Sequence, residues 1–174
     1  MAVKYLVDVI NQPNRVSCWA AAFLMLKRYA LRRTGLGMDI DGPLERMIGL
    51  SSTKARRENA RPLNWQHLTS WCNHLGLHWK YVGIDPVGIS NALSTYGPLV
   101  YIAKLPGSGW QHALVITGAY PHPSDYYRIM FNDPDGGRRR ELGAVEFIRR
   151  YPPYFQINND AQSLVVYAPR NYVR

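Results

Sequence analysis

The strongest apolar pattern in the first half of the chain is the unbroken run from Cys18 to Leu26. Apolar residues at helical spacing continue through CWAAAFLMLKRYALRR, where lysine and arginine lie in the last turns before Thr34. Ser17, directly before the run, is a favourable N-cap residue. Because the first half of this helix is apolar almost all round, we expect it to be buried.

Weaker patterns predict further elements on both sides of that helix. Residues 3–10 alternate weakly and predict a short strand or an extended arm. Capping residues delimit a helix over 64–76 and another over 85–97, and the segment 78–84 between them predicts a strand. Residues 38–62 show little pattern beyond one short helical segment and an exposed basic loop.

The pattern changes after Pro98 to β-rich runs bounded by glycine, proline, serine and aspartate. No helical segment separates the first two runs, which disfavours a parallel doubly wound sheet. Helices followed by strands predict an α+β fold, in which the buried helix packs on an antiparallel sheet in the second half. The length of 174 residues, without internal repeats, predicts a single domain over residues 1–174. The four β-rich runs are LVYIAKL, HALVITGAY, YYRIMFN and SLVVYAP.

Composition and charge narrow the class of protein. An apolar share of 47% and a charged share of 19% exclude a disordered or fibrous chain. The formal net charge of +9 favours an acidic partner, whether nucleic acid, membrane surface or protein. Two cysteines are too few for a disulfide framework. The longest apolar run is too short to span a bilayer, so we predict no membrane anchor. The N-terminus is interrupted by Asp8 and lacks a small-residue cleavage site, so we predict no signal peptide.

Cys18 is the first candidate for chemistry because it lies in the first turn of the expected helix. Backbone N–H groups and the helix dipole stabilise a thiolate at that position, although a free cysteine is also a common core residue. Gln12 precedes Cys18 by six residues, across a turn-forming segment. Its amide NH₂ and the Cys18 N–H could together form an oxyanion hole, whereas an isolated loop glutamine is usually only solvated.

His112 and Asp133 are the candidate acid–base pair. His112 opens the run HALVITGAY, and Asp133 follows the run YYRIMFN. If these runs form an antiparallel pair, the two side chains meet at one end of the sheet. His112 could then exchange a proton with Cys18 while Asp133 accepts the second ring N–H. Asn132 would point to the opposite face of the strand, so we favour Asp133 and keep Asn132 as the alternative orienting residue.

The order of these motifs resembles the papain-like cysteine peptidases. The matching segments run from Gln12 through Ser17-Cys18-Trp19 and Gln111-His112-Ala113 to Asn132-Asp133-Pro134. The resemblance is closest to small bacterial branches, namely double-glycine leader peptidases and avirulence-effector proteases. It implies a triad of Cys18, His112 and Asp133 (or Asn132), with Gln12 in the oxyanion hole. It also implies a helical half with the cysteine, a β half with the histidine, and no metal or cofactor.

The same resemblance implies a cysteine endopeptidase that cleaves target proteins after glycine or another small residue. Trp19 and Trp110 would narrow the substrate cleft on either side of the reacting carbonyl. The family members that stand free of a transporter are secreted effectors or interbacterial toxins. We therefore expect a monomer made in the bacterial cytoplasm and delivered into a target cell without a signal peptide. An acidic immunity or inhibitor protein would cover the active site.

Three alternatives remain open at this stage. The same triad could perform deamidation, transglutamination or cleavage of cell-wall peptides. The basic stretches 56–57 and 138–140 could bind nucleic acid, but they are short and match no nucleic-acid motif, so we expect solvated faces and no nucleic-acid partner. A zinc site would need ligands at tighter spacing than the chain offers, so we expect a structural role for its candidates, which are His67, Cys72, His74 and His78.

Overall fold

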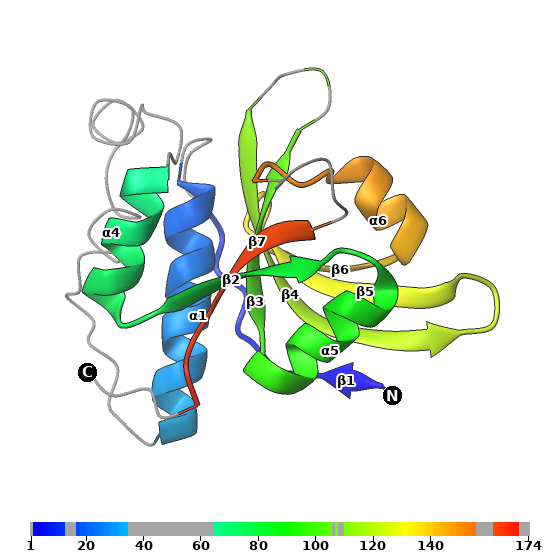
Figure 1. The fold of residues 1–174 in the computed structure, drawn as a ribbon, viewed down its shortest axis with the longest axis horizontal. Helices are drawn as coiled ribbons and strands as arrows, with labels where there is room; N and C mark the ends of the chain where they lie inside the picture. The colour runs from blue at the N-terminus through cyan, green and yellow to red at the C-terminus, as the bar shows by residue number, and fades with distance from the viewer. Residues whose placement is uncertain are drawn as a thin grey trace.

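The computed structural model describes residues 2–12, 17–34, 65–105, 107, 110–155 and 162–170. The strands within these segments form a seven-stranded sheet in the order β2-β7-β3-β4-β5-β6, with β1 paired to β4 (Figure 1). Every strand pairing is antiparallel, which confirms the predicted α+β fold. The strands are β1 Val3–Lys4, β2 His78–Gly83, β3 Leu99–Lys104, β4 Gln111–His122, β5 Tyr126–Asp133, β6 Arg138–Gly143 and β7 Gln162–Tyr167.

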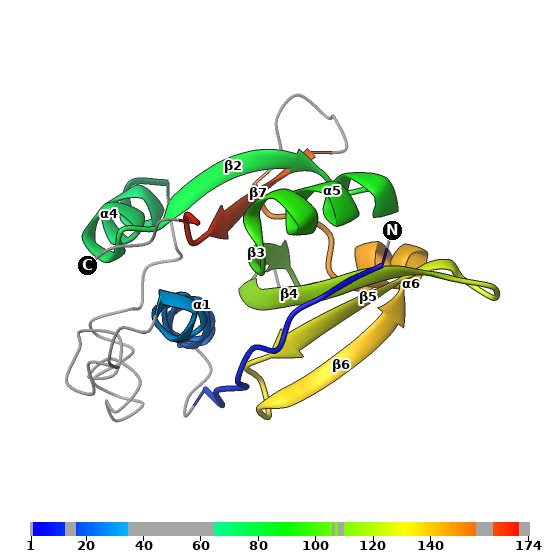
Figure 2. The same ribbon diagram turned by 90° about the horizontal axis from the view of Figure 1, so that it is seen from below.

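Helices cover both faces of this sheet. The helices are α1 Cys18–Thr34, α4 Trp65–Leu75, α5 Pro86–Tyr96 and α6 Ala144–Arg150. Side chains of α1 and α4 share one core with one face of the sheet, and those of α5 and α6 share a second core with the other face. Figure 2, which views the molecule from below, shows α1 and α5 on opposite sides of β3 and β4.

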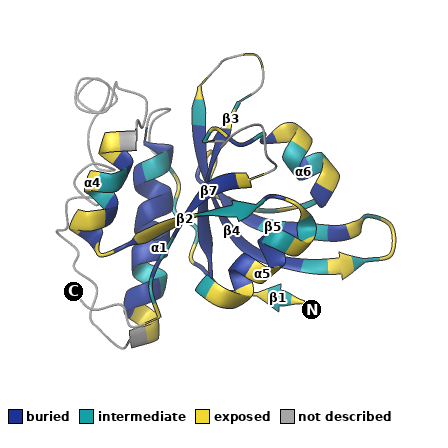
Figure 3. Cartoon of the chain, viewed as in Figure 1, coloured by how far each residue is buried: buried dark blue, intermediate teal, exposed yellow. Residues whose placement is uncertain are grey.

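Continuous apolar runs form the centre of the sheet because both of its faces are covered. Along β3, Val100 and Ile102 belong to the core of α1, whereas Leu99 and Tyr101 belong to the core of α5 and α6. Alternate residues of a strand point to opposite faces, so both sets must be apolar. Figure 3 shows the resulting band of buried residues through the middle of the sheet.

The predicted helices and strands of the described segments are confirmed within a few residues. Asp85 caps α5 by accepting hydrogen bonds from the Val87 and Gly88 backbone N–H groups at 2.9 and 3.0 Å. The expected Asn64 cap, the weakly patterned residues 38–62 and the basic pair at 56–57 lie outside the described residues. No helix in the described part of the chain is long and apolar enough to cross a membrane.

The structure contains an edge strand, β6, and a short helix, α6, that the sequence pattern does not predict. The basic run 138–140 begins β6; Arg138 and Arg139 are exposed, as expected of a solvated face, but two residues of the run also make specific contacts that the sequence does not predict. Arg139 donates a hydrogen bond to the Val7 carbonyl at 3.2 Å, and Arg140 Nε lies 3.1 Å from Asp133 Oδ2. An edge strand has one unpaired side, and β6 has no buried residue, so its sequence lacks the apolar alternation that reveals a strand.

The N-terminal segment is mostly an extended arm. Only the first residues pair as β1, opposite Gly118 and Ala119 of β4. The arm then continues along the sheet, where the Tyr5 N–H donates to the Thr117 carbonyl at 2.7 Å. It ends at the β5–β6 turn, where the Gln12 N–H donates to the Pro134 carbonyl at 2.9 Å. Figure 2 follows this path from the N-terminus toward the region between α1 and β6.

Candidate active site

Cys18 is the first residue of α1, as the capping pattern predicts. It is 6% exposed, and the preceding Ser17 is fully buried. The Ser17 carbonyl accepts a hydrogen bond from the Ala21 N–H at 3.0 Å, which closes the first helical turn. The N–H groups at a helix start have no acceptor one turn earlier, so they lie beside the thiol with their partial positive charge.

His112 and Asp133 meet at one end of the sheet. Strands β4 and β5 are antiparallel neighbours, so the start of one adjoins the end of the other. His112 Nε2 lies 2.8 Å from Asp133 Oδ1, and both side chains are buried. Because Asp133 engages Nε2, the ring nitrogen left for the Cys18 thiol is Nδ1, and Cys18 is a hydrogen-bond partner of the ring. The structure thus joins a helix start and two strand ends into one chain of polar contacts.

This chain of contacts changes the protonation of His112. Burial alone would lower the pKa of the imidazole, because a buried cation loses its hydration. The hydrogen bonds to Asp133 and Cys18, and the negative charge on both partners, outweigh burial and raise the pKa of His112 to about 9. The environment therefore favours an imidazolium over a neutral ring.

Asp133 is held in its ionised form by its surroundings. Burial would raise the pKa of the carboxyl, but the hydrogen bond and charge of His112 lower it, as do the Asp135 N–H and the charge of Arg140. The Asp135 N–H donates to Oδ1 at 3.0 Å. These contacts keep an acceptor fixed beside the His112 ring, and Tyr151 packs near that ring with a centroid distance of 6.3 Å.

Asn132 points away from His112, as strand alternation predicts. Its fully buried side chain donates from Nδ2 to the Val7 carbonyl at 3.1 Å, on the arm. The structure therefore pairs the histidine with the aspartate and the asparagine with the N-terminal arm.

Gln12 lies at the same end of the sheet, because its N–H is bonded to Pro134, next to Asp133. Its side chain is half-buried, and its Oε1 is buried with no hydrogen-bond partner among the described residues. A half-turn of the terminal torsion exchanges the amide oxygen and NH₂, so this side chain can present a donor to a bound molecule.

Trp19 and Trp110, the two tryptophans expected at the substrate cleft, have different surroundings. Trp19 packs in the helical half, with its ring centroid 5.9 Å from Phe23 and 5.3 Å from Trp71. Trp110 is 65% exposed, two residues before His112, and its carbonyl accepts the Leu105 N–H where β3 turns into β4. Trp110 is therefore the tryptophan whose ring has room to contact a substrate near His112.

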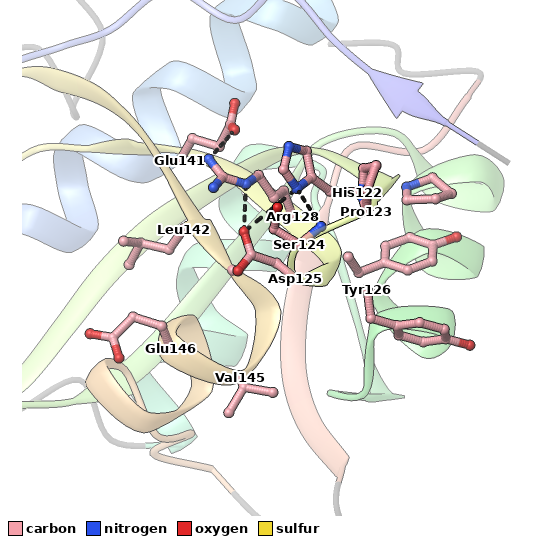
Figure 4. A pocket seen from close by; sticks show the side chains of 13 residues that line it. His122, Pro123, Ser124, Asp125, Tyr126, Arg128, Glu141, Leu142, Val145 and Glu146 are labelled. Carbon is pink, nitrogen blue, oxygen red and sulfur yellow. Dashed lines mark hydrogen bonds and ion pairs between the residues drawn. The ribbon is translucent and has the colours of Figure 1, made fainter.

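A surface hollow lies at the opposite end of β4, about 30 Å along the strand from His112 at the usual rise per residue. Figure 4 shows Arg128 between Asp125 and Glu141 in this hollow. Arg128 Nε is 2.7 Å from Asp125 and Nη1 is 3.0 Å from Glu141, so these charges pair with one another. The hollow contains no cysteine or serine near a base apart from the exposed Ser124 beside His122, and we assign it no part in the chemistry.

The metal candidates are dispersed. Cys72 is fully buried in the core of α1 and α4, where burial raises the pKa of its thiol to about 12. His74 packs on Trp71, and His78 packs on Tyr167. Among the described residues, no three histidine, cysteine or acidic side chains gather in one place.

Comparison with known proteins identifies the family. A family model described as papain-like cysteine protease AvrRpt2 matches residues 1–152. The chain belongs to this family. A solved structure, the peptidase domain of Streptococcus ComA, a bi-functional ABC transporter involved in a quorum-sensing pathway, supports the fold of the protease. It matches with a TM-score of 0.57 and 13% sequence identity, over 94% of this chain and 99% of that chain. A search of curated proteins found no match.

The two thiols of the protease should differ strongly in reactivity. We expect iodoacetamide at pH 6 to alkylate Cys18 at least about 100 times faster than Cys72, because a thiolate is the reacting species and burial suppresses it at Cys72. Peptide mass spectrometry over a time course measures both rates in one sample. Equal labelling, or faster labelling of Cys72, would contradict the assignment of Cys18 as the reactive thiol.

Proposed function

We propose that the protease is a cysteine endopeptidase with Cys18 as nucleophile, His112 as acid and base, and Asp133 as orienting residue. The observation that supports this proposal is the buried chain of contacts from the Cys18 thiol through the His112 ring to Asp133. Nucleophile, base and orienter within hydrogen-bond reach are the pattern of covalent acyl transfer. Gln12 and the Cys18 N–H complete the site as oxyanion donors.

The proposed reaction proceeds in two steps. The Cys18 sulfur attacks the peptide carbonyl carbon while Gln12 and the Cys18 N–H stabilise the negative charge on its oxygen. His112, protonated by the thiol, then donates that proton to the leaving amine as the C–N bond breaks, which leaves a thioester on Cys18. In the second step His112 removes a proton from water, whose oxygen attacks the thioester, and the proton returns to the sulfur as the acid product leaves. Asp133 holds the ring in one orientation throughout.

We also propose that the enzyme cleaves after glycine or another small residue. An exposed Trp110 near His112 would narrow the channel beside the reacting carbonyl, so that only a small side chain permits attack at about 3–3.5 Å. In a peptide library varied at the residue before the cut, wild type should prefer glycine, with Gly-Gly the best substrate. Trp110→Ala should broaden this preference, while Trp79→Ala, at another exposed tryptophan, should leave it unchanged. A preference for arginine, leucine or phenylalanine would refute the proposal.

The biological setting that we propose is that of a bacterial effector or interbacterial toxin acting on proteins inside a target cell. Membership of a family described by the name AvrRpt2 supports this setting. The net charge of +9 favours capture by an acidic immunity or inhibitor protein that covers the Cys18 site.

The association with such a partner should depend on salt. Steering by opposite charges is screened within about 8 Å at physiological ionic strength, so the association rate should fall about tenfold or more between 10 and 300 mM salt. Surface plasmon resonance against an immobilised acidic partner protein, at a series of salt concentrations, measures this rate. A salt-independent rate, or binding that leaves Cys18 open to alkylation, would contradict the expectation.

A further inference from the structure

The N-terminal arm, which we define as residues 5–12, brings Gln12 to the candidate active site. Its last backbone contact is the hydrogen bond from the Gln12 N–H to the Pro134 carbonyl, one residue after Asp133. The same turn therefore holds both the orienting carboxylate and the proposed oxyanion donor. Oxyanion stabilisation depends on a donor placed within a few tenths of an ångström, so whatever fixes the arm also affects catalysis.

Two side chains fix the arm at Val7, five residues before Gln12. Asn132 Nδ2 and Arg139 Nη2 donate to the same Val7 carbonyl at 3.1 and 3.2 Å. Val7 is 1% exposed and Asn132 is fully buried, so the hydrogen bond from Asn132 is shielded from water, whereas Arg139 donates from an exposed position. Asn132 and Arg139 are directly paired residues of β5 and β6. These two side chains, which we call the clamp, are therefore part of the sheet itself.

Two further observations connect Asn132 and the β5–β6 turn with the position of the arm. Its Oδ1 is buried and has no hydrogen-bond partner among the described residues, which is unfavourable for stability. Packing alone would be better served by an apolar side chain, so the contribution of Asn132 lies in its contact with Val7. The β5–β6 turn also closes on the arm at Gly137, where an added Cβ would lie 2.9 Å from Asn11 Cβ.

We propose that Asn132, supported by Arg139, is a positioning residue that places Gln12 beside Cys18 by holding the arm. This inference rests on the proposed role of Gln12 as an oxyanion donor. Because consecutive residues of a strand face opposite ways, one dipeptide serves both parts of the site. Asp133 aligns the base, and Asn132 aligns the oxyanion donor.

The test compares Asn132→Leu and Arg139→Gln, each alone and combined with Gln12→Ala, on the best peptide of the library. Loss of an oxyanion donor lowers kcat about 10²–10³-fold, so its displacement in Asn132→Leu should lower kcat about 10-fold, with KM within about twofold. Arg139→Gln should lower kcat about threefold, since Asn132 still holds the arm. Arg138→Gln, an exposed neighbour that loses the same charge, is the matched control and should leave kcat unchanged.

A second measurement separates positioning of Gln12 from general damage. Alkylation of Cys18 by iodoacetamide forms no oxyanion, so its rate should be unchanged in Asn132→Leu. A peptide aldehyde forms a hemithioacetal whose oxygen occupies the oxyanion hole, so its affinity should fall in proportion to kcat. If the rate of Cys18 alkylation falls together with kcat in Asn132→Leu, the whole active site is disrupted, and the inference is overturned.

The double variants distinguish the inference from its premise. If Gln12→Ala alone leaves kcat unchanged, the oxyanion role of Gln12 fails and the inference fails with it. If Gln12→Ala lowers kcat, we expect no further loss when Asn132→Leu or Arg139→Gln is added. If the losses in kcat multiply, or if Asn132→Leu and Arg139→Gln have no effect as single variants, the positioning role of Asn132 is refuted while the oxyanion role of Gln12 stands. Should Asn132→Leu not fold, the exposed Arg139→Gln decides the outcome by itself.

Discussion

His112→Ala should lower kcat/KM for peptide cleavage by about 10³–10⁴-fold, the largest loss that we expect from a residue other than the nucleophile. The variant removes the group that exchanges a proton with Cys18, and it leaves the Cys18 thiol without its hydrogen-bond partner. Steady-state kinetics on the best peptide, with circular dichroism to verify folding, measure this effect. His122→Ala, at the opposite end of the same strand, is the matched control and should retain full activity. Activity of His112→Ala within tenfold of wild type would exclude His112 as the base.

Asp133→Ala should lower kcat/KM by about 10³-fold, because the ring loses both its orientation and the charge that stabilises an imidazolium. Asp133→Asn keeps an acceptor for the ring nitrogen but loses the charge, so we expect a smaller loss of about tenfold. The pKa of His112 is about 9 in the wild type, where Asp133 and Cys18 raise it against the effect of burial.

The pH dependence of activity supplies the discriminating control for the aspartate. The imidazolium form persists up to its pKa, so the alkaline limb of kcat/KM should lie near pH 9 in the wild type. It should move to lower pH in Asp133→Asn, because a cation without its anionic neighbour loses its proton more readily. The same raised pKa predicts how the free energy of unfolding depends on pH. A raised pKa in the folded state stabilises the fold fully below pH 6.5, and this stabilisation is lost as pH rises through 9. An alkaline limb that is identical in both proteins would contradict the assignment of Asp133.

The sequence predicts those parts of the fold whose elements have a periodic apolar face. The α1 helix, the strands β3, β4 and β7, and the meeting of His112 with Asp133 all follow from apolar runs and their boundaries. Strand β6 is not predicted because an edge strand with charged residues lacks that alternation. Helix α6 is not predicted because its seven residues are too few to show helical spacing. One local signal was available, since Gly136 and Gly137 both have positive φ in the turn before β6, and a Gly-Gly pair is typical of a hairpin.

Long-range contacts explain what no local pattern could reveal about the site. Strand alternation predicts that Asn132 and Asp133 point to opposite faces, but it does not specify what lies on each face. The partner of Asn132 is Val7, 125 residues earlier in the chain. The position of Gln12 depends likewise on Pro134, and Arg140 beside Asp133 belongs to a strand that the pattern does not show. Only the folded arrangement brings these residues together.

The central claim, that Cys18 catalyses cleavage of peptide bonds, is tested most directly by sequencing new protein N-termini in a cell lysate. Wild-type protein and Cys18→Ala are incubated separately with the lysate, and the N-termini that form are labelled and identified by mass spectrometry. We expect new N-termini preceded by glycine or another small residue with the wild type, and none above background with Cys18→Ala. The same new termini with both proteins, or a mass increase of about 1 Da at glutamine without any new terminus, would contradict the account, the latter because it indicates deamidation by the same triad.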